Sequence, residues 1–88
     1  MIRRRVVVAG RVQGVFFRDS CQRLATQQGV SGWIANRDDG TVEAAFEGDP
    51  AAVQALVDWC RNGPPSARVS SIEVFDEEPQ NERDFHVQ

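Results

Sequence analysis

One segment limits the possible folds more than any other: Asp49–Pro65, with the sequence DPAAVQALVDWCRNGPP. Asp49 followed by Pro50 is typical of a helix N-terminus, and Gly63 followed by two prolines is typical of a helix end. Between them, apolar residues recur at i, i+3, i+4 and i+7, namely Val53, Leu56, Val57 and Cys60. A helix with one apolar stripe buries that stripe against another layer. The segment therefore predicts a helix that packs on a sheet.

Short strand patterns precede this helix. The β-branched run Val6–Ala9 is typical of a central strand, and Val30–Asn36 predicts a second strand. The segment Arg37–Gly40 ends in Asp-Gly, a hairpin signal, and leads into a third strand, Thr41–Gly48. In that strand apolar residues alternate with a largely acidic set that includes Glu47. We therefore expect a sheet that is covered on one face only.

Three further segments complete the order of elements. Arg18–Gln28 predicts the first helix, with Asp19 in its first turn and Gly29 after its end. Ala67–Phe75 predicts a fourth strand and Asp84–Gln88 a short fifth one. The order β-α-β-β-α-β plus a short terminal strand is that of the α+β ferredoxin-like split βαβ sandwich. In this fold class, two helices cover one face of an antiparallel sheet.

The loop Gly10–Arg18, with the sequence GRVQGVFFR, connects the first strand to the first helix. Gly10 and Gly14 allow sharp turns, and successive N–H groups in such a loop can form a nest for an oxyanion. The following helix N-terminus adds free N–H groups, and Arg18 can place a guanidinium on two phosphate or carboxylate oxygens. The loop matches neither GxxxxGK[ST] nor GxGxxG. Two interpretations stay open: an anion-binding loop, or a plain connection in which Arg18 forms a salt bridge.

Asn36 is the second candidate site residue. Right-handed crossovers place the glycine loop and the end of the second strand at the same edge of the sheet. The amide of Asn36 could hold a water beside a phosphoryl group in the loop. It could equally be a turn-forming residue next to Arg37–Gly40. The residues alone leave both roles open.

The net charge of −3 is unevenly distributed along the 88 residues. Six of the ten arginines lie in residues 1–23, which suits a small anionic ligand better than a long polyanion. Arg3–Arg5 and Asp76–Glu78 are interpreted as solvated surface. The central strands lack the aromatic block that binds RNA bases, so no nucleic-acid partner is expected.

Cys21, Cys60 and His86 form neither a convincing metal site nor a thiol nucleophile, so no metal and no cofactor are expected. Antiparallel helices could place the two cysteines close together, and we interpret them as buried core thiols. No signal-peptide pattern and no stretch of ~20 apolar residues is present. We therefore expect a single domain, residues 1–88, in the cytoplasm and without a membrane partner.

Three segments together resemble the acylphosphatase family. The loop GRVQGVFFR, Gly10–Arg18, is similar to the family signature. GWIANRDDGTVE, Gly32–Glu43, is similar to the second family block, and GPPSARV, Gly63–Val69, to the family's approach to its fourth strand. The resemblance spans nearly the whole chain. Two departures are Ala35, where the family often has a basic residue, and the final residues FHVQ.

The resemblance implies a metal-free hydrolase that splits the carboxyl–phosphate bond of acyl phosphates. Carried over position by position, Arg18 binds the phosphoryl group and Asn36 orients the attacking water. The residues whose backbone forms the phosphate cradle are Gln13, Gly14, Val15, Phe16, Phe17 and Arg18. A small acyl phosphate is then the partner, and a monomer is expected. The alternative is a noncatalytic module for phosphate or a carbamoyl-phosphate-like ligand, since acylphosphatase-like domains occur inside larger carbamoyl-transfer proteins.

Overall fold

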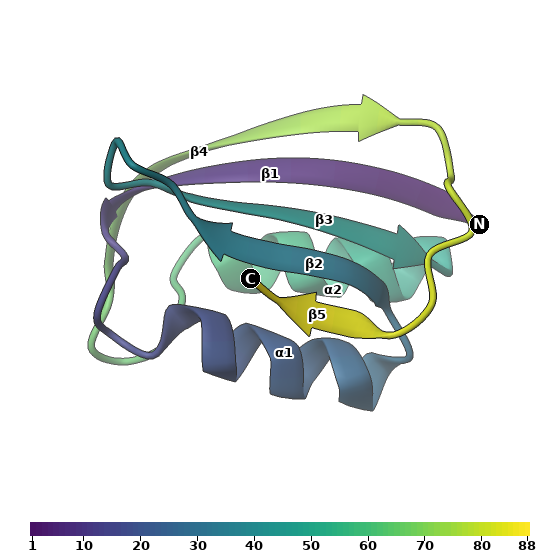
Figure 1. The fold of residues 1–88 in the computed structure, drawn as a ribbon, viewed down its shortest axis with the longest axis horizontal. Coiled ribbons are helices and arrows are strands. Elements are labelled where there is room, and N and C mark those ends of the chain that lie inside the picture. The colour runs from purple at the N-terminus through teal and green to yellow at the C-terminus, as the bar shows by residue number, and fades with distance from the viewer.

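The computed structural model describes residues 1 to 88 in full. The elements are β1 (Ile2–Arg11), α1 (Phe17–Gln28), β2 (Ser31–Asn36), β3 (Val42–Gly48), α2 (Pro50–Cys60), β4 (Arg68–Glu77) and β5 (Phe85–Val87). Figure 1 shows two layers, with both helices on the same face of one sheet. The predicted α+β ferredoxin-like sandwich is confirmed. Neither helix combines the length and apolarity needed to cross a membrane.

The observed elements differ from the predicted ones mainly at their ends. β1 and β4 are longer than their apolar runs because they pair from Arg3 opposite Glu77 to Arg11 opposite Arg68. Ladder hydrogen bonds, which no side-chain pattern reports, set the length of these two strands. α2 begins directly after Asp49 as predicted, although the side chain of Asp49 makes no capping hydrogen bond.

The sheet has the strand order β4-β1-β3-β2-β5. Its first four strands are antiparallel neighbours, as expected. β5, however, pairs with β2 in parallel, so the sheet as a whole is mixed. Figure 1 shows the reason: after β4 the chain crosses the end of the sheet, and β5 starts from the end at which β2 also starts.

The core lies between the sheet and the helices and contains 18 buried residues. The stripe predicted for α2 is part of it, since Val53, Leu56, Val57 and Cys60 are all buried. Phe17 of α1 meets Trp59 of α2 edge to face, with ring centroids 5.0 Å apart. Phe46 of β3 stacks on Phe85 of β5 at 5.8 Å. These two contacts join the helices to one another and fasten the last strand to the core.

Cys21 and Cys60 are free and buried, which confirms their interpretation as core thiols. Burial raises the pKa of the Cys21 thiol well above its usual range, and a hydrogen bond with the Cys60 thiol raises it further. A thiol in this setting stays protonated and is a weak nucleophile. Both residues therefore contribute to packing.

The face of the sheet opposite the helices carries charged side chains, and here two predictions are wrong. Arg3 and Glu47, both predicted to be solvated, are only 2% and 1% exposed. The Nη1 atom of Arg3 lies 3.1 Å from Oε1 of Glu47, and its Nε atom lies 2.9 Å from Oε1 of Glu77. Arg5 also forms ion pairs with acids of β3 and β4 on this face, whereas the side chain of Arg4 lies on the helix-facing side of β1. Arg3 and Arg5 are thus one side of a cross-strand ion-pair network.

The segment 78–84, between β4 and β5, covers the buried end of this network. The backbone N–H groups of Gln80 and Glu82 donate to Oε1 and Oε2 of Glu47 at 2.7 and 3.0 Å. Burial alone would raise the pKa of Glu47, but these two N–H groups together with Arg3 outweigh it and lower that pKa. The Glu47 carboxylate therefore ties the crossing segment to the sheet.

Candidate active site

The loop between β1 and α1 changes direction at positions with left-handed backbone. At Gly10 φ is +122°, and an added Cβ would collide with the backbone oxygen of Arg68 on β4. The register of the pairing with β4 shifts between Ala9 and Gly10, and the pairing then continues to Arg11. Gly14 and Phe16 have φ of +72° and +67°. Such left-handed residues turn successive N–H groups toward one side of a loop.

The backbone N–H groups of this loop are free. None of those from Gln13 to Arg18 donates to an acceptor of the chain. The first intrahelical bond runs from the N–H of Ser20 to the oxygen of Phe16 at 3.1 Å. Backbone donors in folded proteins are normally paired, and free donors at a helix N-terminus favour an anion. The loop therefore offers a row of donors suited to an oxyanion.

Hydrogen bonds from two side chains hold the loop in place. The Nε2 atom of Gln13 donates to the backbone oxygens of Arg37 and Thr41 at 2.7 and 2.9 Å. The hydroxyl of Ser66 donates to the backbone oxygen of Val15 at 3.1 Å. The first contact connects the loop to the β2–β3 hairpin, and the second connects it to the approach to β4. Both partnerships join distant parts of the chain, and the sequence carries no local signal for either.

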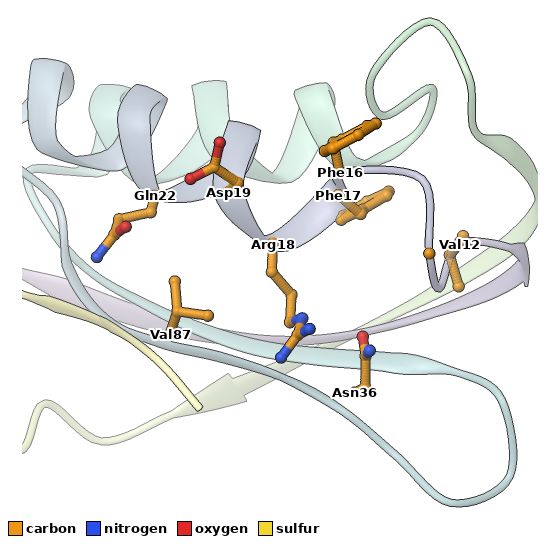
Figure 2. Close-up of a pocket in the computed structure, with 9 residues that line it drawn as sticks. Val12, Phe16, Phe17, Arg18, Asp19, Gln22, Asn36 and Val87 are labelled. Carbon is orange, nitrogen blue, oxygen red and sulfur yellow. The ribbon is translucent and has the colours of Figure 1, made fainter.

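Arg18 lies in the first turn of α1 and is half-buried. Figure 2 shows its side chain extending from the helix toward the end of β2. Its Nη1 atom donates to the backbone oxygen of Gln88 at 2.7 Å. No carboxylate side chain forms an ion pair with it. The geometry therefore does not support the interpretation of Arg18 as the salt-bridge residue of a plain connection.

Asn36 is the last residue of β2 and is exposed. Its side chain makes no hydrogen bond with the chain, and Figure 2 shows its amide next to the guanidinium of Arg18. The neighbouring turn is built by other groups: Gly40 donates to the oxygen of Arg37, and Thr41 donates to the carboxylate of Asp39. The amide of Asn36 is thus not needed for the turn and faces the loop.

These groups border a pocket of about 380 Å³. It is lined by Val12, Gly14, Phe16, Phe17, Arg18, Asp19, Gln22, Asn36 and Val87, as Figure 2 shows. The structure therefore brings together most of the residues predicted from the sequence. Gln13 and Val15 are the exceptions among the predicted set. The side chain of Gln13 turns to the hairpin, and that of Val15 is buried.

Four lining residues were not predicted as site residues, namely Val12, Asp19, Gln22 and Val87. Gln22 lies four residues after Arg18 on α1, and helical spacing could have placed both on one face. Val87 reaches the pocket only because β5 pairs with β2, and no local pattern indicates that. Nowhere in the chain do three His, Cys, Asp or Glu side chains gather closely enough to hold a metal ion.

Comparison with known proteins assigns this arrangement to a family. The acylphosphatase family model matches residues 4–87. This chain belongs to the acylphosphatase family. The acylphosphatase of Gloeobacter violaceus is 52% identical over 86 residues, which are 98% of this chain and 92% of that protein. The crystal structure of acylphosphatase from Bacillus subtilis is 38% identical, covers 100% of this chain and 99% of that one, and has a TM-score of 0.95. The activity of acylphosphatases is hydrolysis of acyl phosphates, so the chain is a hydrolase.

A much larger protein contains the same fold. The structure of T. kodakarensis HypF is similar over 100% of this chain, with 30% identity and a TM-score of 0.86. The matching region is only 12% of the HypF chain. The acylphosphatase fold therefore also occurs as one part of a larger molecule.

Proposed function

We propose that this acylphosphatase holds the phosphoryl group of its substrate in the cradle formed by the backbone of Gln13–Arg18. The observation that carries the proposal is the row of free N–H donors beside the Arg18 guanidinium and the Asn36 amide. In phosphoryl transfer, negative charge is spread over the phosphoryl oxygens in the transition state. Donors that are already oriented stabilise that charge without further rearrangement. Arg18 supplies the neutralising charge.

The chemical step needs a water placed opposite the acyl oxygen. Asn36 orients this water through its amide. The water oxygen forms a bond to phosphorus while the bond between phosphorus and the acyl oxygen breaks, and the electron pair of that bond leaves with the carboxylate. No His, Glu or Lys lines the pocket, and its one carboxylate, that of Asp19, is paired with Arg23 at 2.9 Å. The water proton therefore passes to a phosphoryl oxygen of the substrate. The products are a carboxylate and inorganic phosphate.

Hydrolysis of benzoyl phosphate with and without EDTA tests the function. We expect turnover that EDTA leaves unchanged, since an arginine and backbone donors balance the phosphoryl charge. Activity that disappears in EDTA and returns with a divalent metal would contradict the metal-free mechanism. Binding of phosphate without turnover of any acyl phosphate would instead favour a noncatalytic binding module.

Asn36→Ala is expected to lower kcat for benzoyl phosphate about 100-fold, because the lost contact is to the water. The inhibition constant of inorganic phosphate is expected to change by less than about twofold, since phosphate is held by the loop and Arg18. Asn62→Ala, an exposed asparagine after α2, is the control and should keep full activity. Weaker phosphate binding with an unchanged kcat would assign Asn36 to the cradle.

We also propose that residues 1–88 act as one monomeric domain in the cytoplasm, on small molecules only. The net charge of −3 supports this proposal, because a negatively charged protein is not attracted to nucleic acids or anionic lipids. Light scattering that gives a solution mass of 9.8 kDa would support the monomer, and twice that mass would contradict it.

A further inference from the structure

Phe16 combines three locally unfavourable features. It is the N-cap residue of α1, a position that Ser, Thr, Asn and Asp prefer. Its backbone is left-handed, which is uncommon for a residue with a bulky side chain. The residue is 74% exposed. The left-handed backbone serves the cradle, but glycine or asparagine would adopt it at lower cost. The aromatic ring therefore has a purpose other than shaping the loop.

The ring of Phe16 forms a boundary between two hollows. On one side is the active-site pocket. On the other is a groove of about 360 Å³, whose lining is Phe16, Asp19, Ser20, Arg23, Pro64, Pro65 and Ser66. The apolar walls of the groove are thus one exposed aromatic ring and two prolines. Phe16 and Asp19 are the residues that both hollows share.

The charges at this boundary discriminate between classes of acyl group. Arg23 is the cation of the groove, and its Nη2 atom is already paired with the Asp19 carboxylate at 2.9 Å. The pair has no net charge, so the groove offers no excess positive charge to a second anionic group. An uncharged ring or branched chain, in contrast, gains contact area on Phe16 and the prolines.

We propose that Phe16 is a specificity-determining residue that binds the acyl half of the substrate, and that the preferred substrates are acyl phosphates with an uncharged aromatic acyl group. The inference rests on the proposed function, because it takes the phosphoryl group to lie in the cradle. In the bound substrate, the acyl group then extends from the active-site pocket across the Phe16 ring toward Pro64 and Pro65. Acyl phosphates with a second negative charge are poorer substrates.

The test compares the wild-type protein with Phe16→Ala and Phe16→Asn. The alanine variant keeps a Cβ, and asparagine tolerates the left-handed backbone, so the pair separates loss of the ring from backbone strain. Phe75→Ala is the matched control, because Phe75 is also exposed but lies on β4, outside both hollows. The measured quantity is kcat/KM for benzoyl, acetyl and succinyl phosphate, together with the inhibition constant of inorganic phosphate.

We expect wild type to prefer benzoyl phosphate over both other substrates. Both Phe16 variants should lose about tenfold of the benzoyl-to-acetyl ratio, in the range of one aromatic contact. This ratio cancels any change that the substitutions make in the phosphate cradle, because the two substrates share the phosphoryl group. An unchanged ratio overturns the proposal, including an equal loss for all substrates and for phosphate, because the side chain would then act only through the cradle. A preference for succinyl phosphate also overturns it.

A binding measurement separates this inference from the proposed hydrolysis. Titration calorimetry with benzylphosphonate and methylphosphonate, which cannot be hydrolysed, should show tighter binding of the aromatic compound to wild type only. If that preference is present but no acyl phosphate is turned over, the hydrolysis proposal fails and the acyl site stands. If acyl phosphates are turned over but neither assay shows an aromatic preference, the acyl site fails and hydrolysis stands.

Discussion

Replacing Arg18 by Gln is expected to lower kcat/KM for benzoyl phosphate about 1000-fold. Removal of one neutral transition-state donor from an enzyme costs about 100- to 1000-fold, and a charged, forked donor lies at the upper end. Arg18 is the one cation among the residues that line the pocket, so nothing else can replace its charge. The inhibition constant of inorganic phosphate should rise as well, because the guanidinium also contacts the bound anion. Steady-state kinetics and phosphate inhibition measure both effects.

Arg61→Gln is the matched control for this experiment. Arg61 lines neither hollow and pairs only with Asp58 at an exposed position, so its loss should change kcat/KM by less than about threefold. Circular dichroism and thermal unfolding check that both variants are folded, since Arg18 also donates to the oxygen of Gln88. Arg18→Gln with more than a tenth of wild-type activity would refute the proposed role of Arg18. Equal losses in the two variants would indicate a general electrostatic effect.

Replacing Glu47 by Ala is expected to lower the free energy of unfolding by about 3 kcal/mol. The substitution leaves the buried guanidinium of Arg3 with a poorer set of partners and removes the acceptor of the Gln80 and Glu82 N–H groups. Breaking a buried ion pair costs about 3 to 5 kcal/mol, and the low end applies because Arg3 keeps its contact with Glu77. Urea unfolding at pH 7 measures the change.

Glu43→Ala provides the comparison on the same strand and the same face. Glu43 pairs with Arg5 and Arg37, each at 3.1 Å, but water reaches these groups. The expected cost is below about 1 kcal/mol. If Glu43→Ala destabilised the protein as much as Glu47→Ala, the covering by segment 78–84 would not be the source of the Glu47 effect.

The same glutamate predicts a pH dependence of stability. The pKa of Glu47 is lower in the folded protein than its ordinary value of 4.5, so its stabilisation is fully present above that value. It is lost as the pH falls below 4.5 and through the folded-state pKa, because the folded protein must then take up a proton it binds weakly. The difference in stability between wild type and Glu47→Ala should therefore be constant from pH 7 to about 5 and shrink at lower pH. A difference that grew in acid would contradict the assignment.

Local sequence patterns predicted those elements in which the spacing of apolar residues shows which face is buried. The stripe of α2 follows from one periodicity and is observed. The alternation expected in β3 is not observed, because every residue of β3 except Glu43 is buried. For the glycine loop, the backbone freedom of Gly10 and Gly14 left two interpretations open, an anion site or a plain connection, and the resemblance to acylphosphatases favoured the anion site. The alternation failed at Glu47, because it assumed that nothing covers the second face of the sheet. That assumption was wrong at the place where segment 78–84 crosses.

The sequence by itself determined the order of elements, the loop with its arginine, and the position of Asn36 at the end of β2. These depend on residues that are near one another in the chain. The tertiary structure alone decided that Gln13 connects the loop to the hairpin, that β5 runs parallel to β2, and that Gln88 meets Arg18. Each of these contacts joins residues far apart in sequence, and such pairings are set by the packing of the whole chain and not by any local period.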